Sequence, residues 1–124
     1  SFLNVHEGPQ RISPVAHDVA LQEGMVLSNE PGYYEKNWGG IRLENLYLVK
    51  KSDKLPQHPD GKDWLAFEEL TLIPFDRRLV DRNLLSTKEL HWLDEYHIRV
   101  YSEISPMLDN SKDFQWLTWA CGID

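Results

Sequence analysis

The sequence predicts an α+β fold in which antiparallel strands come first and helices follow. Up to about Pro74, the 124-residue chain is rich in β-forming residues and in the Gly and Pro that separate short strands. From Ser86 onward, apolar residues recur instead at the spacing of an amphipathic helix. We therefore expect a strand-rich part over residues 1–75 and a helical part over residues 76–124.

The composition excludes several classes of protein. A net charge of -7, with no stripe of Lys and Arg, excludes a nucleic-acid-binding surface. No apolar run approaches the roughly 20 residues that span a membrane, so we expect no membrane segment. The single cysteine, Cys121, rules out an internal disulfide framework and fits a cytoplasmic protein. Because the first residue is Ser1 and not Met, we expect the chain to be part of a longer protein.

The first quarter of the chain predicts two short strands separated by a loop. Residues 1–8 alternate as a strand does, and a Gly-Pro pair ends them. Residues 10–23 are mostly polar and predict a loop. Residues 25–30 predict the second strand, and Pro31 favours an extended backbone at Glu30, the residue before it.

The segment NEPGYYEKNWGGIRLEN, residues 29–45, predicts a β-hairpin. Pro31-Gly32 has the chemistry of a tight turn, and Trp38-Gly39-Gly40 offers a second permissive position. Residues 41–49 predict the strongest strand of the chain. Apolar residues lie on both of its faces, so we expect it to be buried on both sides.

Two further elements complete the strand-rich part. Residues 50–63 are polar, contain two prolines and predict a loop. Residues 64–74 predict a third long strand. Glu68 and Glu69 are adjacent within it and point to opposite faces, so they cannot act as a catalytic pair.

The helical part carries clear start and stop signals. Ser86 and Glu89 have the spacing of a capping box, which predicts a helix that begins there and ends near Pro106. A second helix is predicted over residues 113–120, with Gly122 as its stop signal.

Glu30 and Glu44 are the most suggestive acidic residues. A hairpin would bring both carboxylates to one place, with Arg42 on the same strand face as Glu44. Two interpretations remain open from the spacing alone. A structural Glu–Arg pair is favoured, because two carboxylates are too few ligands for most divalent-metal sites. The other interpretation is a metal site that Arg42 supports.

The histidines and aromatic residues suggest weaker sites. His6 precedes a strand end, where a neutral imidazole could donate a hydrogen bond to an oxyanion; an ordinary surface histidine is the alternative. His97 lies on the apolar stripe of the first helix and is interpreted as a satisfied core or interface residue. The C-terminal aromatic residues form either core or a protein-binding patch. They are Trp92, Tyr96, Trp116 and Trp119.

Four strings in order give the chain a resemblance to a known family. They are FLNVHEGPQRIS, GMVLSNEPGYY, GIRLENLYLV and FEELTLIPFDRRLV. Together they resemble aminopeptidase P, the Xaa-Pro aminopeptidases of the pita-bread metallopeptidase family, in their long cytosolic form. The resemblance covers almost the whole chain. It implies that residues 1–124 are the carboxy-terminal part of a pita-bread catalytic domain.

The resemblance also implies a reaction and a site. The family removes an N-terminal residue that precedes proline, using two divalent metal ions, usually manganese, that activate a water. Glu30 and Glu44 match two of its metal ligands, and Glu30 is also expected to assist proton transfer. Arg42 matches an arginine just behind the ligands. His6 matches a histidine near the scissile carbonyl, and Tyr34 matches a residue that lines the site.

The same resemblance implies that the site is incomplete within these residues. Two aspartates and a histidine that complete the ligand set are expected before Ser1. We therefore expect the isolated chain to bind metal weakly and to be inactive, and we expect the parent protein to be a homo-oligomer. A non-catalytic binding or dimerisation module of a pita-bread relative is the alternative function.

Overall fold

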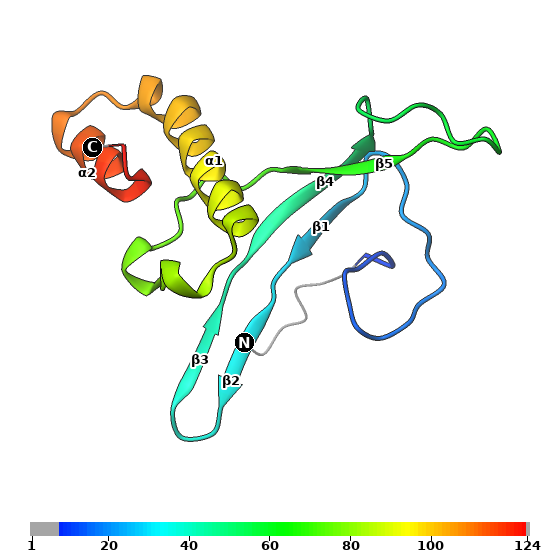
Figure 1. Cartoon of the computed structure of the whole chain (residues 1–124), viewed down its shortest axis with the longest axis horizontal. Helices are drawn as coiled ribbons and strands as arrows, with labels where there is room; N and C mark the ends of the chain where they lie inside the picture. Colours follow the sequence, from blue (N-terminus) through cyan, green and yellow to red (C-terminus); the bar gives the residue numbers. More distant parts are fainter. Residues whose placement is uncertain (1–7, 124) are drawn as a thin grey trace. The chain divides into compact units, whose positions relative to one another are not determined.

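A computed structural model of the chain describes residues 8–123. It separates into two compact units, Ser1–Thr71 and Leu72–Asp124. The first contains the strands and the second the helices, which confirms the predicted α+β class of antiparallel strands followed by helices (Figure 1). None of the helices in the described part has the length and apolar character needed to cross a membrane.

The strands of the first unit form a three-stranded sheet and a two-stranded ribbon. The sheet has the order β1-β4-β5 and the ribbon pairs β2 with β3, all antiparallel (Figure 1). Their bounds are β1 Val26–Asn29, β2 Gly32–Glu35, β3 Gly39–Arg42, β4 Asn45–Lys51 and β5 Leu65–Glu69. Residues 10–23 form a loop, as predicted. The predicted strand over residues 1–8, with His6, lies outside the described residues apart from its last position.

The tight turn of the hairpin lies at the second of the two predicted positions and not at the first. The chain turns at residues 36–38, where Asn37 has φ 67°, and Gly39, which begins β3 directly after the turn, has φ 141°; Pro31-Gly32 does not form the turn. Gly32 instead begins β2, and the Pro31 carbonyl accepts a 3.0 Å hydrogen bond from the Leu43 N–H of the opposite strand. Asn tolerates the left-handed backbone that such a turn needs.

The predicted strand over residues 41–49 is two strands in the structure. It is interrupted at Leu43–Glu44, between β3 and β4. The expectation of burial on both sides is also wrong. Val49 is 1% exposed, whereas Leu46, on the opposite face, is 44% exposed, because the described residues cover only one face of β4.

The third predicted strand, residues 64–74, is shorter in the structure. The Leu70 N–H still donates to the Leu46 carbonyl at 2.8 Å. The Leu46 N–H, however, donates to the side-chain Oγ1 of Thr71 at 2.9 Å. Because a hydroxyl takes the place of a backbone carbonyl there, the ladder ends and β5 stops at Glu69.

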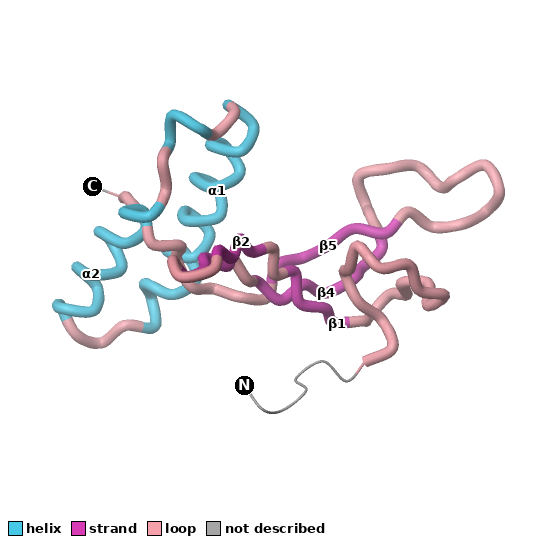
Figure 2. Tube along the Cα trace, turned by 90° about the horizontal axis from the view of Figure 1, so that it is seen from below, coloured by secondary structure: helices cyan, strands magenta, loops and turns pink. Residues whose placement is uncertain are grey.

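Both predicted helices are confirmed. Figure 2 shows the second unit as helices joined by short loops. The bounds are η1 Arg77–Leu79, η2 Arg82–Leu84, α1 Thr87–Ile104, η3 Ser105–Met107 and α2 Ser111–Cys121. Ser86 and Glu89 form a complete capping box at the start of α1. Gly122 ends α2 in the left-handed conformation, as its position predicts.

The core of the second unit lies between α1 and α2. Its buried members are Tyr96, Val100, Leu117 and Cys121. His97 is also buried, and its Nε2 accepts a 3.1 Å hydrogen bond from the Phe75 N–H, which confirms its interpretation as a satisfied core residue. The four C-terminal aromatic residues differ in burial. Tyr96 is core, whereas Trp92, Trp116 and Trp119 remain partly exposed.

Candidate metal centre

Glu30 and Glu44 fall in the same interruption of the hairpin. The β1–β4 ladder ends at the pair Asn29–Asn45, and the β2–β3 ladder begins at the pair Gly32–Arg42. Each glutamate lies directly beside the last pair of β1–β4, on opposite strands. Pro31 helps to set this interruption, since it has no N–H to donate to a ladder.

Arg42 bridges the two carboxylates. Its Nη1 lies 3.2 Å from Glu30 Oε2, and its Nη2 lies 3.2 Å from Glu44 Oε2. The guanidinium therefore neutralises two like charges that the hairpin brings together, and its planar fork suits that task. All three side chains keep some exposure, so the group is open to solvent on one side.

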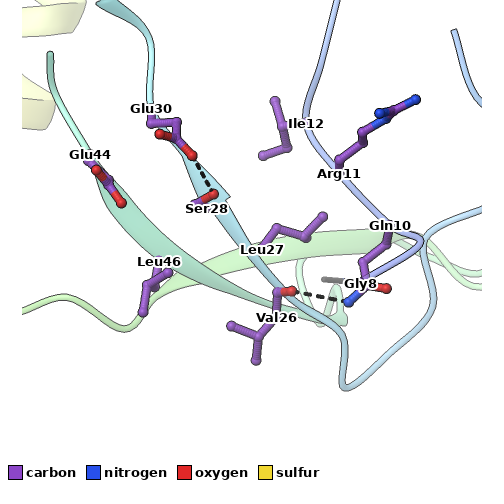
Figure 3. A pocket seen from close by; sticks show the side chains of 10 residues that line it. All are labelled: Gly8, Gln10, Arg11, Ile12, Val26, Leu27, Ser28, Glu30, Glu44 and Leu46. Carbon is purple, nitrogen blue, oxygen red and sulfur yellow. Dashed lines mark hydrogen bonds between the residues drawn. The ribbon is translucent and has the colours of Figure 1, made fainter. Parts of the chain in front are cut away.

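Ser28 holds the other oxygen of Glu30. Its Oγ donates a 2.8 Å hydrogen bond to Glu30 Oε1 (Figure 3). Sequence reasoning missed this residue, although its place two residues before Glu30 puts it on the same face of an extended chain. With Arg42 at Oε2, both oxygens of this carboxylate have a partner, so its rotation is restrained.

Both glutamates line a pocket of about 520 Å³. Its walls come from β1, β4 and residues 8–12, and Figure 3 shows Glu30 and Glu44 on neighbouring strands at one end of it. The Gln10 Nε2 donates to the Val26 carbonyl at 3.3 Å, which ties the segment of residues 8–12 to the edge of β1. A hydrated cation can therefore reach both carboxylates.

The other predicted site residues are not assembled there. Tyr34 lies on β2, is 66% exposed and packs its ring against Gly40, where any Cβ would overlap the ring. It is not among the residues that line the pocket. His6 lies outside the described residues. The structure thus brings together Glu30, Glu44 and Arg42 from the predicted set, and adds Ser28.

These residues fit part of a divalent-metal site. Two carboxylates side by side supply the hard oxygen donors that Mg²⁺ and Mn²⁺ prefer. Within residues 8–123, however, no group of three or more His, Cys, Asp or Glu side chains is arranged to hold a metal ion. The described chain therefore provides two carboxylates and their supporting residues, and further ligands are needed for a full coordination shell.

Comparison with protein families agrees with this chemistry. Residues 2–51 match the model of metallopeptidase family M24, and residues 63–122 match the C-terminal region of peptidase M24. The two matches cover most of the chain. The chain belongs to metallopeptidase family M24. The segment of the M24 match includes Ser28, Glu30, Arg42 and Glu44.

The similar proteins are named as aminopeptidases. Aminopeptidase P2 of Arabidopsis thaliana is 47% identical over 116 residues, which are 93% of this chain and 16% of that protein. A "Probable Xaa-Pro aminopeptidase P" of Coprinopsis cinerea is 45% identical over 119 residues, 94% of this chain and 19% of that protein. This M24 chain therefore spans less than a fifth of the length of these relatives.

A solved structure shows the same fold. The X-prolyl aminopeptidase of Caenorhabditis elegans matches with a TM-score of 0.69 and 35% identity, over 82% of this chain and 16% of that one. It is described as a cytosolic enzyme with a di-nuclear active site. The likeness confirms the expected pita-bread assignment for this M24 chain.

Proposed function

We propose that this chain is the carboxy-terminal part of the catalytic domain of an Xaa-Pro aminopeptidase, with a dinuclear metal site. The observation that carries the proposal is the pairing of Glu30 and Glu44 in one interruption of the hairpin, bridged by Arg42 and facing a pocket. Family membership and the names of the relatives support the specificity for peptides with proline in the second position.

Each residue has a proposed role in hydrolysis. Glu30 and Glu44 would hold the metal ions, and Glu30 would also take the proton of the attacking water. When bound, two divalent ions supply Lewis-acid stabilisation of the scissile carbonyl and acidify the water. His6 would donate a hydrogen bond to the carbonyl oxygen, and Tyr34 would contact the substrate. Arg42 balances the negative charge of the two carboxylates before metal binds.

Several finer features belong to the same proposal. We propose manganese as the metal, because carboxylate oxygens suit this hard ion. A cytoplasmic location is supported by the description of the C. elegans enzyme as cytosolic. We also propose that the whole protein is a homo-oligomer, in which partly exposed aromatic side chains such as Trp116 and Trp119 would find cover.

The 124 residues alone would not complete the reaction. Two carboxylates provide too few ligands for a dinuclear site, so the isolated chain should bind Mn²⁺ weakly and leave X-Pro peptides uncleaved. Two aspartates and a histidine from elsewhere in the longer protein would complete the site. Tight, stoichiometric Mn²⁺ binding by the isolated chain would contradict this part of the proposal.

The test uses the full-length protein that contains this chain. Glu30→Gln and Glu44→Gln should each abolish release of the N-terminal residue from an X-Pro peptide and reduce the manganese content measured after metal loading. Glu68→Gln is the matched control, because Glu68 is a half-exposed glutamate that pairs with Lys50 at 2.9 Å outside the pocket. Normal cleavage by the two site variants would overturn the proposal. A wild-type protein that binds no metal and cleaves nothing would favour the binding-module alternative.

A further inference from the structure

The segment before α1 carries one short pattern twice. Residues 76–80 read DRRLV, and residues 81–85, directly after them, read DRNLL. In each half the aspartate caps one 3₁₀ turn, because its Oδ1 accepts a 3.0 Å hydrogen bond from the backbone N–H two residues later. Arg77 and Arg82 are therefore the equivalent first residues of η1 and η2.

Both of these arginines line a pocket of about 300 Å³ in the second unit. Its wall consists of Arg77, Arg78, Val80, Arg82, Leu93 and Trp119. Three guanidinium groups thus meet an apolar surface, and none of the described residues in the wall is acidic. The chain as a whole has a net charge of -7, so this concentration of positive charge is local. A cleft lined by one sign of charge attracts ligands of the opposite sign.

Two of the three arginines are held by aspartates outside the pocket. Arg78 Nη2 lies 2.6 Å from Asp76 Oδ2, and Arg82 donates to the two oxygens of Asp94 at 2.9 Å and 3.0 Å. Neither aspartate lines this pocket. The Arg78 guanidinium also lies over the Trp119 ring, 5.6 Å from its centroid. These contacts orient two guanidinium groups at the wall.

Arg77 differs from the other two. Within residues 8–123 it forms no ion pair with a carboxylate, so the three arginines and two aspartates leave one positive charge in excess. Its Nη1 donates to the Trp119 carbonyl at 3.0 Å, which fixes the side chain at the end of α2. Its Nε and Nη2 have no acceptor among these residues, and together they form the side of a guanidinium that binds two oxygens at once.

We propose that this pocket binds a small organic anion. Its phosphate or carboxylate group would accept hydrogen bonds from Nε and Nη2 of Arg77, beside Arg82, and its apolar part would lie on Val80, Leu93 and Trp119. The planar fork of arginine matches two oxygens of either acid group. A volume of about 300 Å³ is at the lower end of the range for small-molecule pockets, which suits a ligand no larger than one ring with its acid group. No metal ion takes part in this binding, which stands or fails independently of the proposed function.

The test is a calorimetric titration of the full-length protein after its metal is removed, so that no metal ion can hold the anion. The probes are phenyl phosphate, benzoate and the neutral benzyl alcohol, in a buffer of low chloride. We expect at least one of the two anions to bind and benzyl alcohol not to bind. Tighter binding of phenyl phosphate would assign the pocket to phosphate esters, tighter binding of benzoate to carboxylic acids, and equal binding to both. If neither anion binds, or if benzyl alcohol binds equally well, the inference is wrong.

Variants at Arg77 locate the binding. Arg77→Gln should weaken binding of the better anion by about 10-fold or more, because a charge-assisted hydrogen bond is lost. Arg77→Lys keeps the charge without the fork and should give an intermediate affinity. Arg99→Gln is the matched control, since Arg99 pairs with Glu103 within α1 at 2.7 Å and does not line the pocket. Wild-type affinity in Arg77→Gln would overturn the inference.

A second pair of variants leaves every arginine in place, because Arg77 also holds the end of α2 and its loss could disturb folding. Val80 is a half-buried residue of the pocket wall. Val80→Asp adds a carboxylate there and should abolish measurable binding. Val80→Asn has nearly the same size without the charge, so it should bind the anion more tightly than Val80→Asp does. Equal affinities in these two proteins would show that the charge of the pocket does not hold the probe, and the inference would fail.

Discussion

Ser28 Oγ donates a 2.8 Å hydrogen bond to Oε1 of Glu30 from two residues earlier on the chain. Because Arg42 lies at Oε2, the hydroxyl completes the restraint of this carboxylate. A ligand that is already oriented loses less entropy when a metal binds. The hydroxyl of Ser28 is therefore a small group with a direct bearing on the proposed metal site.

We predict that Ser28→Ala weakens Mn²⁺ binding to the full-length protein about 10-fold, as loss of a hydrogen bond to a metal ligand commonly does. Calorimetric titration of the metal-free protein measures the effect. Ser28→Thr keeps the hydroxyl and should bind Mn²⁺ as the wild type does. Ser102→Ala is the control, because that hydroxyl donates to the Arg99 carbonyl within a helix. Equal affinities for Ser28→Ala and Ser102→Ala would contradict the prediction.

Arg42 should stabilise the metal-free protein by neutralising two carboxylates. We predict that Arg42→Gln lowers the free energy of unfolding by up to about 1 kcal/mol, because all three groups keep some exposure to solvent. The loss should shrink at high salt, which screens exposed charges. Denaturant unfolding at low and high sodium chloride measures both effects. In a background with Glu30→Gln and Glu44→Gln, the same substitution should change stability little; an unchanged loss there would show that Arg42 acts elsewhere.

Features that depend on neighbouring residues, such as helix ends, are predicted well from the sequence, whereas features that depend on pairing between strands are predicted poorly. The capping box at Ser86 and the stop at Gly122 depend on neighbouring residues only, so both helices are predicted close to their observed bounds. The interruption at Leu43–Glu44 depends on which residue of the opposite strand lies across from it. Periodicity within one strand carries no such information, and residues 41–49 therefore read as a single strand.

The candidate site shows the same limit. Glu30, Glu44 and Arg42 stand out in the sequence because charges within an apolar strand need a partner. Ser28 does not stand out, since serine is an ordinary strand residue and only the structure shows that its hydroxyl is turned toward the Glu30 carboxylate. The available signal was its place two residues before Glu30, which puts both side chains on the same face of an extended chain.

Stability should depend on pH through His97. Burial lowers the pKa of this imidazole, and the charge of Arg77 lowers it further, whereas Asp94 opposes the shift. The unfolded chain binds the proton near pH 6.5, but the folded protein binds it only at lower pH. The contribution of the neutral His97 side chain to the free energy of unfolding is therefore complete above about pH 6.5 and is lost as the pH falls through the folded pKa.

The measurement is the free energy of unfolding between about pH 8 and about pH 5, compared with His97→Gln. Glutamine has an oxygen that can accept the Phe75 N–H and has no proton to gain in this range. The variant should lose the part of the pH dependence that His97 contributes, while the other histidines affect both proteins equally. Parallel pH profiles for the two proteins would contradict the assignment.

The capping box should determine the stability of the start of α1. Ser86 Oγ accepts from the Glu89 N–H at 3.3 Å, and the Glu89 carboxylate accepts from the Ser86 N–H at 2.7 Å. We predict that Ser86→Ala lowers the free energy of unfolding by about 1 kcal/mol. Ser86→Asp should keep most of this stabilisation, because aspartate can also cap the helix. Chemical denaturation measures both. A Ser86→Asp protein as unstable as Ser86→Ala would show that the cap contributes little.

The end of α2 offers the sharpest test of packing, because Gly122 has two reasons to be glycine. Its φ is 69°, which a side chain disfavours by about 1–2 kcal/mol. A Cβ there would also lie 2.7 Å from the guanidinium carbon of Arg77, whose Nη1 donates to the Trp119 carbonyl at 3.0 Å. Gly122→Ala should therefore destabilise the protein both through the backbone and through displacement of Arg77.

Gly24→Ala separates the two causes. Gly24 has φ 86°, but nothing lies within 4 Å of the Cβ that a substitution would add. It should show only the backbone cost, so the free energy of unfolding should fall further in Gly122→Ala than in Gly24→Ala. In an Arg77→Ala background the excess should vanish, because the clashing guanidinium is gone. If Gly122→Ala still lost more free energy of unfolding than Gly24→Ala without Arg77, the additional destabilisation would come from the backbone at the end of α2 alone.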